Sequence, residues 1–122
     1  MTTEAVAKRL VELCNAGQGD KAMKELYAKD IVSIEANGTP EMPARIQGIA
    51  AVEEKGAWWY SNNEMHSMSA AGPFIGNRND QFAVKFDMEI TPKGGARTKM
   101  SEIALYTVRN DKIVEEAFLY SM

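Results

Sequence analysis

The chain has 122 residues, of which 45% are hydrophobic and 25% are charged, and its formal net charge is −3 at pH 7. This length fits one domain over residues 1–122, and the apolar fraction is sufficient for a core. No basic patch is present to bind nucleic acid, and the longest apolar runs are far shorter than a membrane span.

Cys14 is the sole cysteine, which excludes an intramolecular disulfide and a cysteine-rich metal site. The N-terminal run MTTEAVAKRL lacks the basic stretch and apolar core of a secretory signal. We therefore expect a cytoplasmic protein, and we expect neither a metal ion nor a cofactor.

Three helices are predicted in the first half of the chain. Apolar side chains recur at helical spacing over residues 3–16, with Glu4 in the first turn and Gly17 placed to end the helix. The apolar stripe consists of Val6, Leu10, Leu13 and Cys14. The two further helices are predicted over residues 18–27 and 48–62.

The other predicted elements are strands, and the segments PKGGAR and RNDK are the turns between the last three. Helices followed by an antiparallel sheet predict an α+β fold, in which a cone-shaped, curved antiparallel sheet is covered by three helices. The mouth of such a cone is a natural place for a ligand. The predicted strands cover residues 30–36, 65–71, 81–91, 99–109 and 112–121.

The closing segment EIALYTVRNDKIVEEAFLY mixes acids with aromatic residues. Alternation along its two strands puts five of these side chains on one face, and an aliphatic set faces the other way. If two carboxyl groups lie within a few ångströms in a dry pocket, one holds a proton and acts as an acid beside its ionised partner. Alternatively, the acids accept hydrogen bonds that fix the core, or they are solvated. The five residues are Glu102, Tyr106, Glu116, Phe118 and Tyr120.

The facing of Asp87 depends on the turn after it. A two-residue turn at Gly94 and Gly95 would place Asp87 opposite Glu102 and turn the apolar side chains of its strand outward. A bulged turn would turn those apolar side chains inward and expose Asp87. The sequence leaves both registers open.

His66 and Trp59 are further candidates. His66 is the sole histidine, and as a general base it would need a carboxylate or a substrate within hydrogen-bond reach. The alternative for His66 is a capped or surface side chain. Trp59 lies on the third predicted helix, where it either packs in the core or lines the pocket.

The stretches RLVELCNAG, ELYAKDIVSIEANG and YTVRNDKIVEEAFLY resemble the SnoaL-like, or polyketide cyclase-like, domains of the nuclear-transport-factor-2-like superfamily. This resemblance implies an α+β cone that is usually dimeric through its outer sheet face. The superfamily includes isomerases, cyclases, epoxide hydrolases, dehydratases and binding modules, so the resemblance implies a fold rather than one reaction.

This chain lacks residues that two reaction mechanisms of these relatives require. In the ketosteroid isomerase relatives the general base matches Glu35, but the two oxyanion donors match Leu10 and a position near Ala104, which we expect to abolish that activity. In the cyclases a motif EHWD often stands where this chain has Glu116 and Phe118, so its His and Asp are replaced.

We expect a homodimer whose pocket binds a small hydrophobic molecule. If the protein is an enzyme, we expect Glu102 and Glu116 to form an acid/base pair and Glu35 to be a second base at the mouth of the cone. The alternative hypotheses are a binding module without turnover and an interaction domain that uses the outer sheet face. Candidate catalytic residues are Glu102, Glu116, Glu35 and His66, and candidate substrate-binding residues are Tyr106, Phe118, Tyr120, Trp59 and Asp87.

Overall fold

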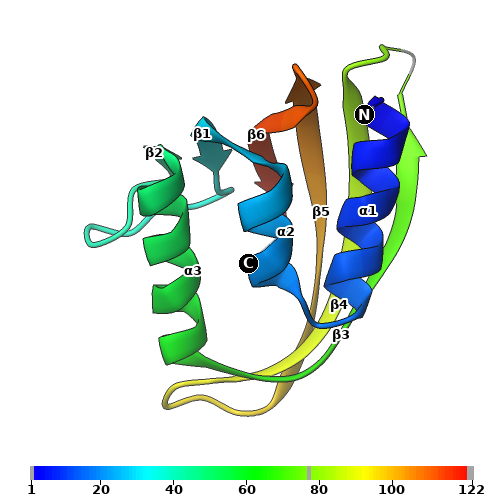
Figure 1. The fold of residues 1–122 in the computed structure, drawn as a ribbon. Helices are drawn as coiled ribbons and strands as arrows, with labels where there is room; N and C mark the ends of the chain where they lie inside the picture. The colour runs from blue at the N-terminus through cyan, green and yellow to red at the C-terminus, as the bar shows by residue number, and fades with distance from the viewer. Residues whose placement is uncertain (1, 77, 121–122) are drawn as a thin grey trace.

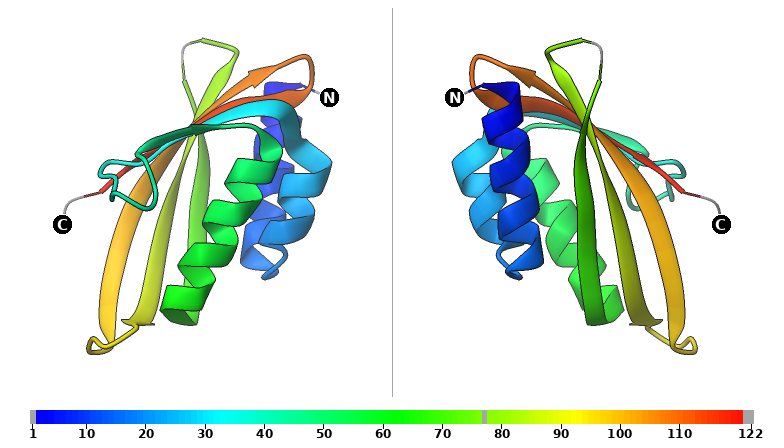
Figure 2. Two further views of the ribbon diagram at one scale, coloured as in Figure 1. Left: turned by 90° about the vertical axis from the view of Figure 1, so that its left-hand side faces the viewer. Right: turned by 90° about the vertical axis from the view of Figure 1, so that its right-hand side faces the viewer.

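Three helices cover one face of a six-stranded curved sheet in the computed structural model, which describes residues 2–76 and 78–120 (Figure 1). Side views show the sheet bending around the helices (Figure 2). We call the helix-covered face the inner face and the opposite one the outer face. The elements are α1 (Thr3–Asn15), α2 (Gly19–Leu26), β1 (Tyr27–Ile34), β2 (Arg45–Gln47), α3 (Ile49–Asn62), β3 (Asn63–Ile75), β4 (Gln81–Pro92), β5 (Thr98–Arg109) and β6 (Lys112–Leu119).

The predicted α+β fold is confirmed, and the three helices begin and end within a residue of their predicted bounds. The strand order is β2-β1-β6-β5-β4-β3. The sheet is mixed rather than fully antiparallel, because β1 pairs with β6 in parallel. The short strand β2 was not predicted, since three residues are too few to show alternation. Position 121, the predicted end of the last strand, lies outside the described residues.

Local chemistry explains the ends of α1. The Oγ1 atom of Thr2 accepts a hydrogen bond from the backbone N–H of Ala5 at 3.1 Å, which caps the helix, and Glu4 lies in the first turn. Gly17 follows the helix with a φ of +72°, a left-handed conformation that glycine adopts without strain. These features fix where α1 starts and stops against the sheet.

The β5–β6 hairpin turns at Asn110 and Asp111, whose φ angles of 52° and 66° fit a tight hairpin turn. The β4–β5 hairpin is longer, because the paired residues end at Ile90 and Thr98. The two predicted hairpins are therefore present, and their turns set which face each side chain occupies.

The longer β4–β5 connection decides between the two registers. Phe86 lies opposite Glu102, and Asp87 lies opposite Ser101. The apolar side chains of β4 consequently face inward and are buried, while Asp87 faces outward. The buried set is Phe82, Val84, Phe86, Met88 and Ile90.

Simple alternation is wrong at one residue of β6. Strict alternation along β6 would put Ile113 on the face of Glu115, but Ile113 is fully buried opposite Val108. The pairing shifts between Thr107 and Val108, which admits an extra residue into β6 and reverses the facing beyond it. Glu116 and Phe118 lie farther from the hairpin turn than this bulge, and both occupy the face that alternation predicts.

The core lies between α1 and the inner face of the sheet. Val6, Leu10 and Leu13 of α1 are each at most 2% exposed, and they belong to one cluster with the buried residues of β4 and β5.

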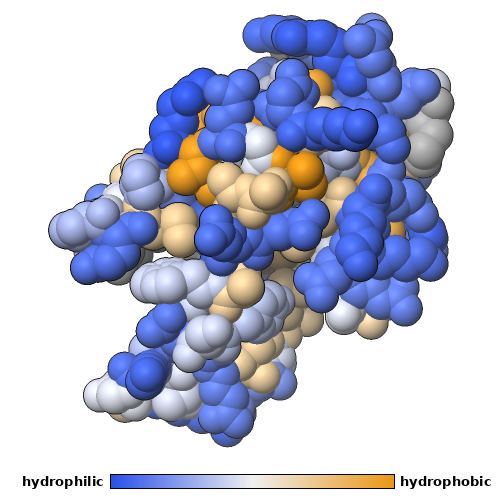
Figure 3. Space-filling view, turned by 60° about the vertical axis from the view of Figure 1, so that its left-hand side comes forward, coloured by the Kyte–Doolittle hydropathy of each residue, from blue (hydrophilic) through white to orange (hydrophobic). Residues whose placement is uncertain are grey.

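Among the described residues, no helix combines the length and apolarity needed to cross a membrane. On the side where α3 and β2 lie, apolar residues gather near the middle of the surface with hydrophilic residues around them (Figure 3).

Candidate acid/base site

Glu102 and Glu116 lie on the inner face, as alternation predicts. Tyr106 pairs with Glu116 across the β5–β6 ladder, and Ala104 pairs with Phe118. Glu116 is 3% exposed, and Glu102 is half-buried. Two carboxyl groups therefore occupy a face that otherwise forms the core.

Glu116 is a hydrogen-bonded carboxyl. Its Oε1 atom accepts from the hydroxyl of Tyr27, and its Oε2 atom accepts from Oγ of Ser33 at 2.7 Å. Ser33 is its direct neighbour in the parallel β1–β6 pair, so the register of that pair creates the contact. Burial raises the pKa of Glu116, and the hydrogen bonds from Tyr27 and Ser33 offset part of the increase. Both oxygens of this buried group have a donor.

Lys55 of α3 connects this carboxyl to a second acid. Its Nζ atom lies 2.8 Å from Oε1 of Glu35 and donates to Oγ of Ser33. The side chains of Lys55 and Glu35 are 12% and 22% exposed. A continuous chain of polar contacts thus runs from Glu35 through Lys55 and Ser33 to Glu116.

Glu102 has a different environment. Within residues 2–76 and 78–120, no side chain makes a hydrogen bond or ion pair with its carboxyl group. Burial, with smaller contributions from the Glu35 and Glu116 carboxyls and against the opposing Lys55 charge, raises its pKa to about 7. Near neutral pH, this carboxyl exchanges readily between its acid and base forms.

The two tyrosines border the acids. Tyr106 is buried and stacks on Phe82 with ring centroids 4.9 Å apart. Burial and the nearby Glu35 carboxylate raise the pKa of Tyr120 to about 12. Both hydroxyl groups are protonated at neutral pH and can donate hydrogen bonds.

His66 and Asp87 do not join this group of residues. Nε2 of His66 lies 2.7 Å from Oγ1 of Thr91. Thr91 is five residues along β4 from Phe86, the residue opposite Glu102, which corresponds to roughly 16 Å of strand. Asp87 accepts a hydrogen bond from Ser101 on the outer face. Of the two registers that the sequence leaves open, the β4–β5 pairing selects the one that turns Asp87 away from the cone.

Trp59 and Phe118 both pack against the core cluster and are half-buried. The ammonium group of Lys55 lies 5.0 Å from the centroid of the Phe118 ring. Phe118 therefore forms an apolar wall beside the charged residues, whereas Trp59 contacts the core from α3.

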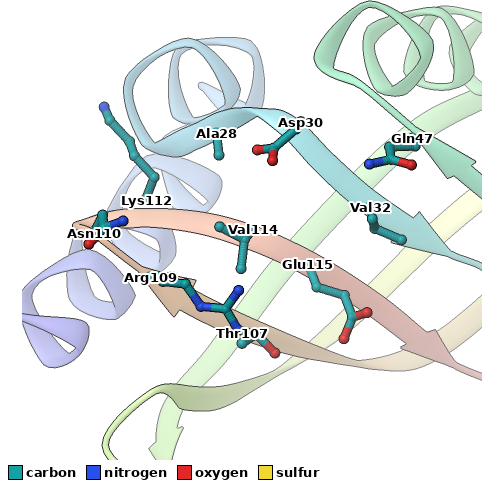
Figure 4. Close-up of a pocket in the computed structure, with 10 residues that line it drawn as sticks. All are labelled: Ala28, Asp30, Val32, Gln47, Thr107, Arg109, Asn110, Lys112, Val114 and Glu115. Atoms are coloured by element: carbon teal, nitrogen blue, oxygen red, sulfur yellow. The ribbon is translucent and has the colours of Figure 1, made fainter.

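Two surface hollows, of about 460 and 450 Å³, lie away from Glu102 and Glu116. The first opens beside β1, β5 and β6, where Figure 4 shows Asp30, Arg109 and Glu115 among its lining residues. The second lies between the end of α3 and the β4–β5 turn. Neither hollow is the predicted cone interior.

Tyr27, Ser33 and Lys55 were not predicted as site residues, although the sequence contains a signal for two of them. Lys55 follows Val52 by three residues and precedes Trp59 by four, which is the spacing of a shared helix face. Ser33 lies two residues from Ile31 and two from Glu35, so alternation along this segment places all three side chains on one face.

No three His, Cys, Asp or Glu side chains are placed to hold a metal ion in the part of the chain that the structure describes. On the inner face Lys55 and Glu35 form an ion pair, and Glu116 accepts hydrogen bonds from Tyr27 and Ser33. The chemistry that this arrangement offers is proton transfer and hydrogen bonding.

Comparisons with known proteins identify relatives of the whole chain. The family model of the SnoaL-like domain matches residues 1–120. No curated protein matches the sequence. A crystal structure from Mesorhizobium loti, provisionally named a SnoaL-like polyketide cyclase, is 41% identical with a TM-score of 0.91. That match covers 98% of this chain and 100% of the other.

More distant structures show the same fold. A nuclear-transport-factor-2-like protein of unknown function from Exiguobacterium sp. 255-15 has 17% identity and a TM-score of 0.70, covering 95% of this chain and 98% of its own. A computationally designed binder of 17-OHP has 17% identity and a TM-score of 0.69, and the match covers 100% of this chain and 95% of the binder. At such identities the likeness concerns the fold alone.

Proposed function

This chain belongs to the SnoaL-like domain family, and we propose that it is an acid/base enzyme that acts on a small hydrophobic molecule at its inner-face acids. The observation that carries the proposal is the contrast between Glu102 and Glu116. Glu102 has no hydrogen-bond partner among the described residues and has a pKa of about 7, while two donors hold Glu116. A general acid or base works best when its pKa lies near the working pH.

The roles follow from these environments. Glu102 carries the proton to and from the substrate, and Glu116 is the fixed, hydrogen-bonded carboxyl beside it. Glu35 is bound to Lys55, so it orients this side chain at the edge of the site. Such a site suits isomerisation, cyclisation, or the addition or removal of water, because each of these reactions requires a proton transfer.

A binding module without turnover is the second candidate. The burial of Glu116 favours it, because a carboxyl with both oxygens satisfied is also a structural feature. In that case the apolar interior would hold a ligand, and Glu102 would serve only as a hydrogen-bonding group.

We test the two candidates by incubating the protein with a panel of small cyclic ketones, enones and epoxides and following product formation by mass spectrometry. The enzyme proposal expects product with the wild-type protein and a loss of about 100-fold or more in Glu102→Gln. Glu53→Gln, on the exposed side of α3, is the matched control and should retain activity. Binding of panel members without any product, unchanged in Glu102→Gln, would favour the binding module.

We further propose that a second copy of the chain covers the outer sheet face. Large apolar side chains are exposed there, including Ile103, Leu105 and Leu119 at 37%, 36% and 59%. Apolar patches of this kind often mark interfaces. Sedimentation analysis should show a dimer that Leu105→Glu converts to a monomer, and a monomeric wild-type protein would contradict this proposal.

A further inference from the structure

Lys55 has a hydrogen-bond donor that its contacts in the protein do not use. A lysine ammonium group carries three N–H donors. Two of them go to Oγ of Ser33 and Oε1 of Glu35. Among residues 2–76 and 78–120 no third acceptor contacts this group, and its Nζ atom lies 5.0 Å from the centroid of the Phe118 ring. An oxygen atom of a ligand resting on Phe118 would be within reach of this donor.

Glu102 and Lys55 flank the same aromatic ring. Phe118 lies opposite Ala104, and Glu102 is two residues along β5 on the same face. Two residues of strand correspond to about 7 Å, which is the width of one small ring. The two charged groups also interact, because the Lys55 charge acts to lower the pKa of Glu102. One unpartnered carboxyl and one available ammonium donor therefore border a common apolar surface.

We propose that Lys55 is a catalytic residue that donates a hydrogen bond to the carbonyl oxygen of the substrate while Glu102 removes a proton from the adjacent carbon. This inference rests on the proposed function and names its substrate class. The substrate is a small, neutral alicyclic or aromatic ketone with a hydrogen on the carbon next to the carbonyl group.

The step balances without a further reactant. The ionised Glu102 carboxylate takes the proton, the electron pair of the C–H bond becomes a carbon–carbon double bond, and the carbonyl oxygen becomes an enolate oxygen. Lys55 stabilises that oxygen through its N–H donor. Return of the proton from Glu102 to a carbon atom of the enolate completes the reaction.

Lys55 supplies a hydrogen-bond donor that the side chains of Leu10 and Ala104 cannot provide. Leu10 and Ala104 occupy the positions of two oxyanion donors in related isomerases, and both residues are buried and apolar here. Lys55 reaches the interior from α3 instead and brings a full positive charge. Because Glu35 and Glu116 also face this space, an anionic substrate would be repelled, and a neutral ketone is favoured.

The test uses 1-tetralone, an aromatic ketone, dissolved in D₂O with the purified protein. Proton NMR follows the loss of the hydrogens next to its carbonyl group as deuterium replaces them. The wild-type protein should exchange them faster than buffer. Lys55→Met should lose about 100-fold or more of the rate, the usual effect of removing an oxyanion donor. Lys55→Arg, which keeps a charged donor, should retain most of it.

Two further variants separate catalysis from folding. Lys24→Met removes an exposed lysine of α2 and should exchange 1-tetralone as the wild type does. Lys55→Gln keeps a neutral donor and should give an intermediate rate. This variant tests the role of Lys55 if Lys55→Met does not fold. Bound 1-naphthol, a stable analogue of the enol, should ionise at a higher pH in Lys55→Gln than in the wild type, as its absorbance reports.

The outcomes are distinct. Exchange that depends on Glu102 but is equal in wild type, Lys55→Gln and Lys55→Met would overturn the role of Lys55 and leave the proposed function intact. Exchange that does not depend on Glu102 would overturn both. A wild-type protein that gives no exchange above buffer would overturn this inference, and the panel of epoxides and enones would then decide the proposed function.

Discussion

Helices α1 and α3 both lie on the inner face of the sheet, but they cover it in different ways. Five residues of α1 are buried, whereas α3 buries Val52 alone. Under α1 the contacts are apolar, and under α3 they include Lys55 with its acid and serine partners. The first region therefore stabilises the fold, and the second holds charged groups in a partly dry environment.

The difference shows how one small domain separates stability from chemistry. Burial of apolar side chains favours folding, while burial of a carboxyl without a partner opposes it. The protein tolerates Glu102 in this position because α1 and the strands beneath it supply the packing. A residue that reduces stability without a structural partner is a good candidate for a functional group.

Leu10→Ala should have the largest effect, because Leu10 is 2% exposed at the centre of the region under α1. We expect a loss of about 2–5 kcal/mol in the free energy of unfolding, measured by chemical denaturation. The pKa of Glu102 should stay near 7 in the folded variant. A large change of that pKa would show that the two regions are not separate.

Glu102→Gln should stabilise the protein above neutral pH. The folded-state pKa of Glu102 lies near 7 and its unfolded value near 4.5, so ionisation costs stability as the pH rises through this window. The difference corresponds to roughly 3 kcal/mol, because one pKa unit equals about 1.4 kcal/mol. Glutamine cannot ionise and avoids this cost.

The measurement for Glu102→Gln is denaturation at pH 4 and pH 8. The variant and the wild type should be about equally stable at pH 4, where Glu102 is protonated. At pH 8 the variant should be the more stable of the two, and Glu53→Gln should show no such gain. An equal stability at both pH values would mean that Glu102 is not desolvated.

Lys55→Met should act through electrostatics. The Lys55 charge lowers the pKa values of both Glu102 and Glu116, so its removal should raise both. Carboxyl NMR of the variant gives the direction. Lys55→Arg should keep both values close to those of the wild type, and an unchanged Glu102 pKa in Lys55→Met would place the ammonium group too far away to act on it.

His66→Gln should have the smallest effect. The His66 side chain contacts Thr91 near the β4–β5 turn, and its loss removes a single hydrogen bond, worth about 1 kcal/mol. Turnover and 1-tetralone exchange should match the wild type. A loss of activity as large as that of Glu102→Gln would restore His66 as a catalytic residue.

The sequence predicted most of the fold because its periodic signals are local. The stripe of α1 and the alternation of β5 each depend on neighbouring residues, and both are present as predicted. The parallel β1–β6 pair and the bulge between Ile113 and Glu115 were missed, because they depend on contacts between distant segments and on one inserted residue.

The site was predictable only in part for the same reason. Alternation placed Glu102 and Glu116 on one face, but it could not choose the register that turns Asp87 outward. Ser33 and Lys55 come from β1 and α3, and only the assembled fold brings them to Glu116 and Glu35. Long polar side chains at core-facing positions are the signal that would have identified Lys55.

The most direct test of this account is a pH titration of the Glu102 and Glu116 carboxyl carbons by NMR in the wild-type protein. We predict that Glu102 titrates near pH 7 and that its signal is absent from Glu102→Gln. A Glu102 carboxyl that titrates near its ordinary value of 4.5 would contradict the claim that this residue is poised for proton transfer.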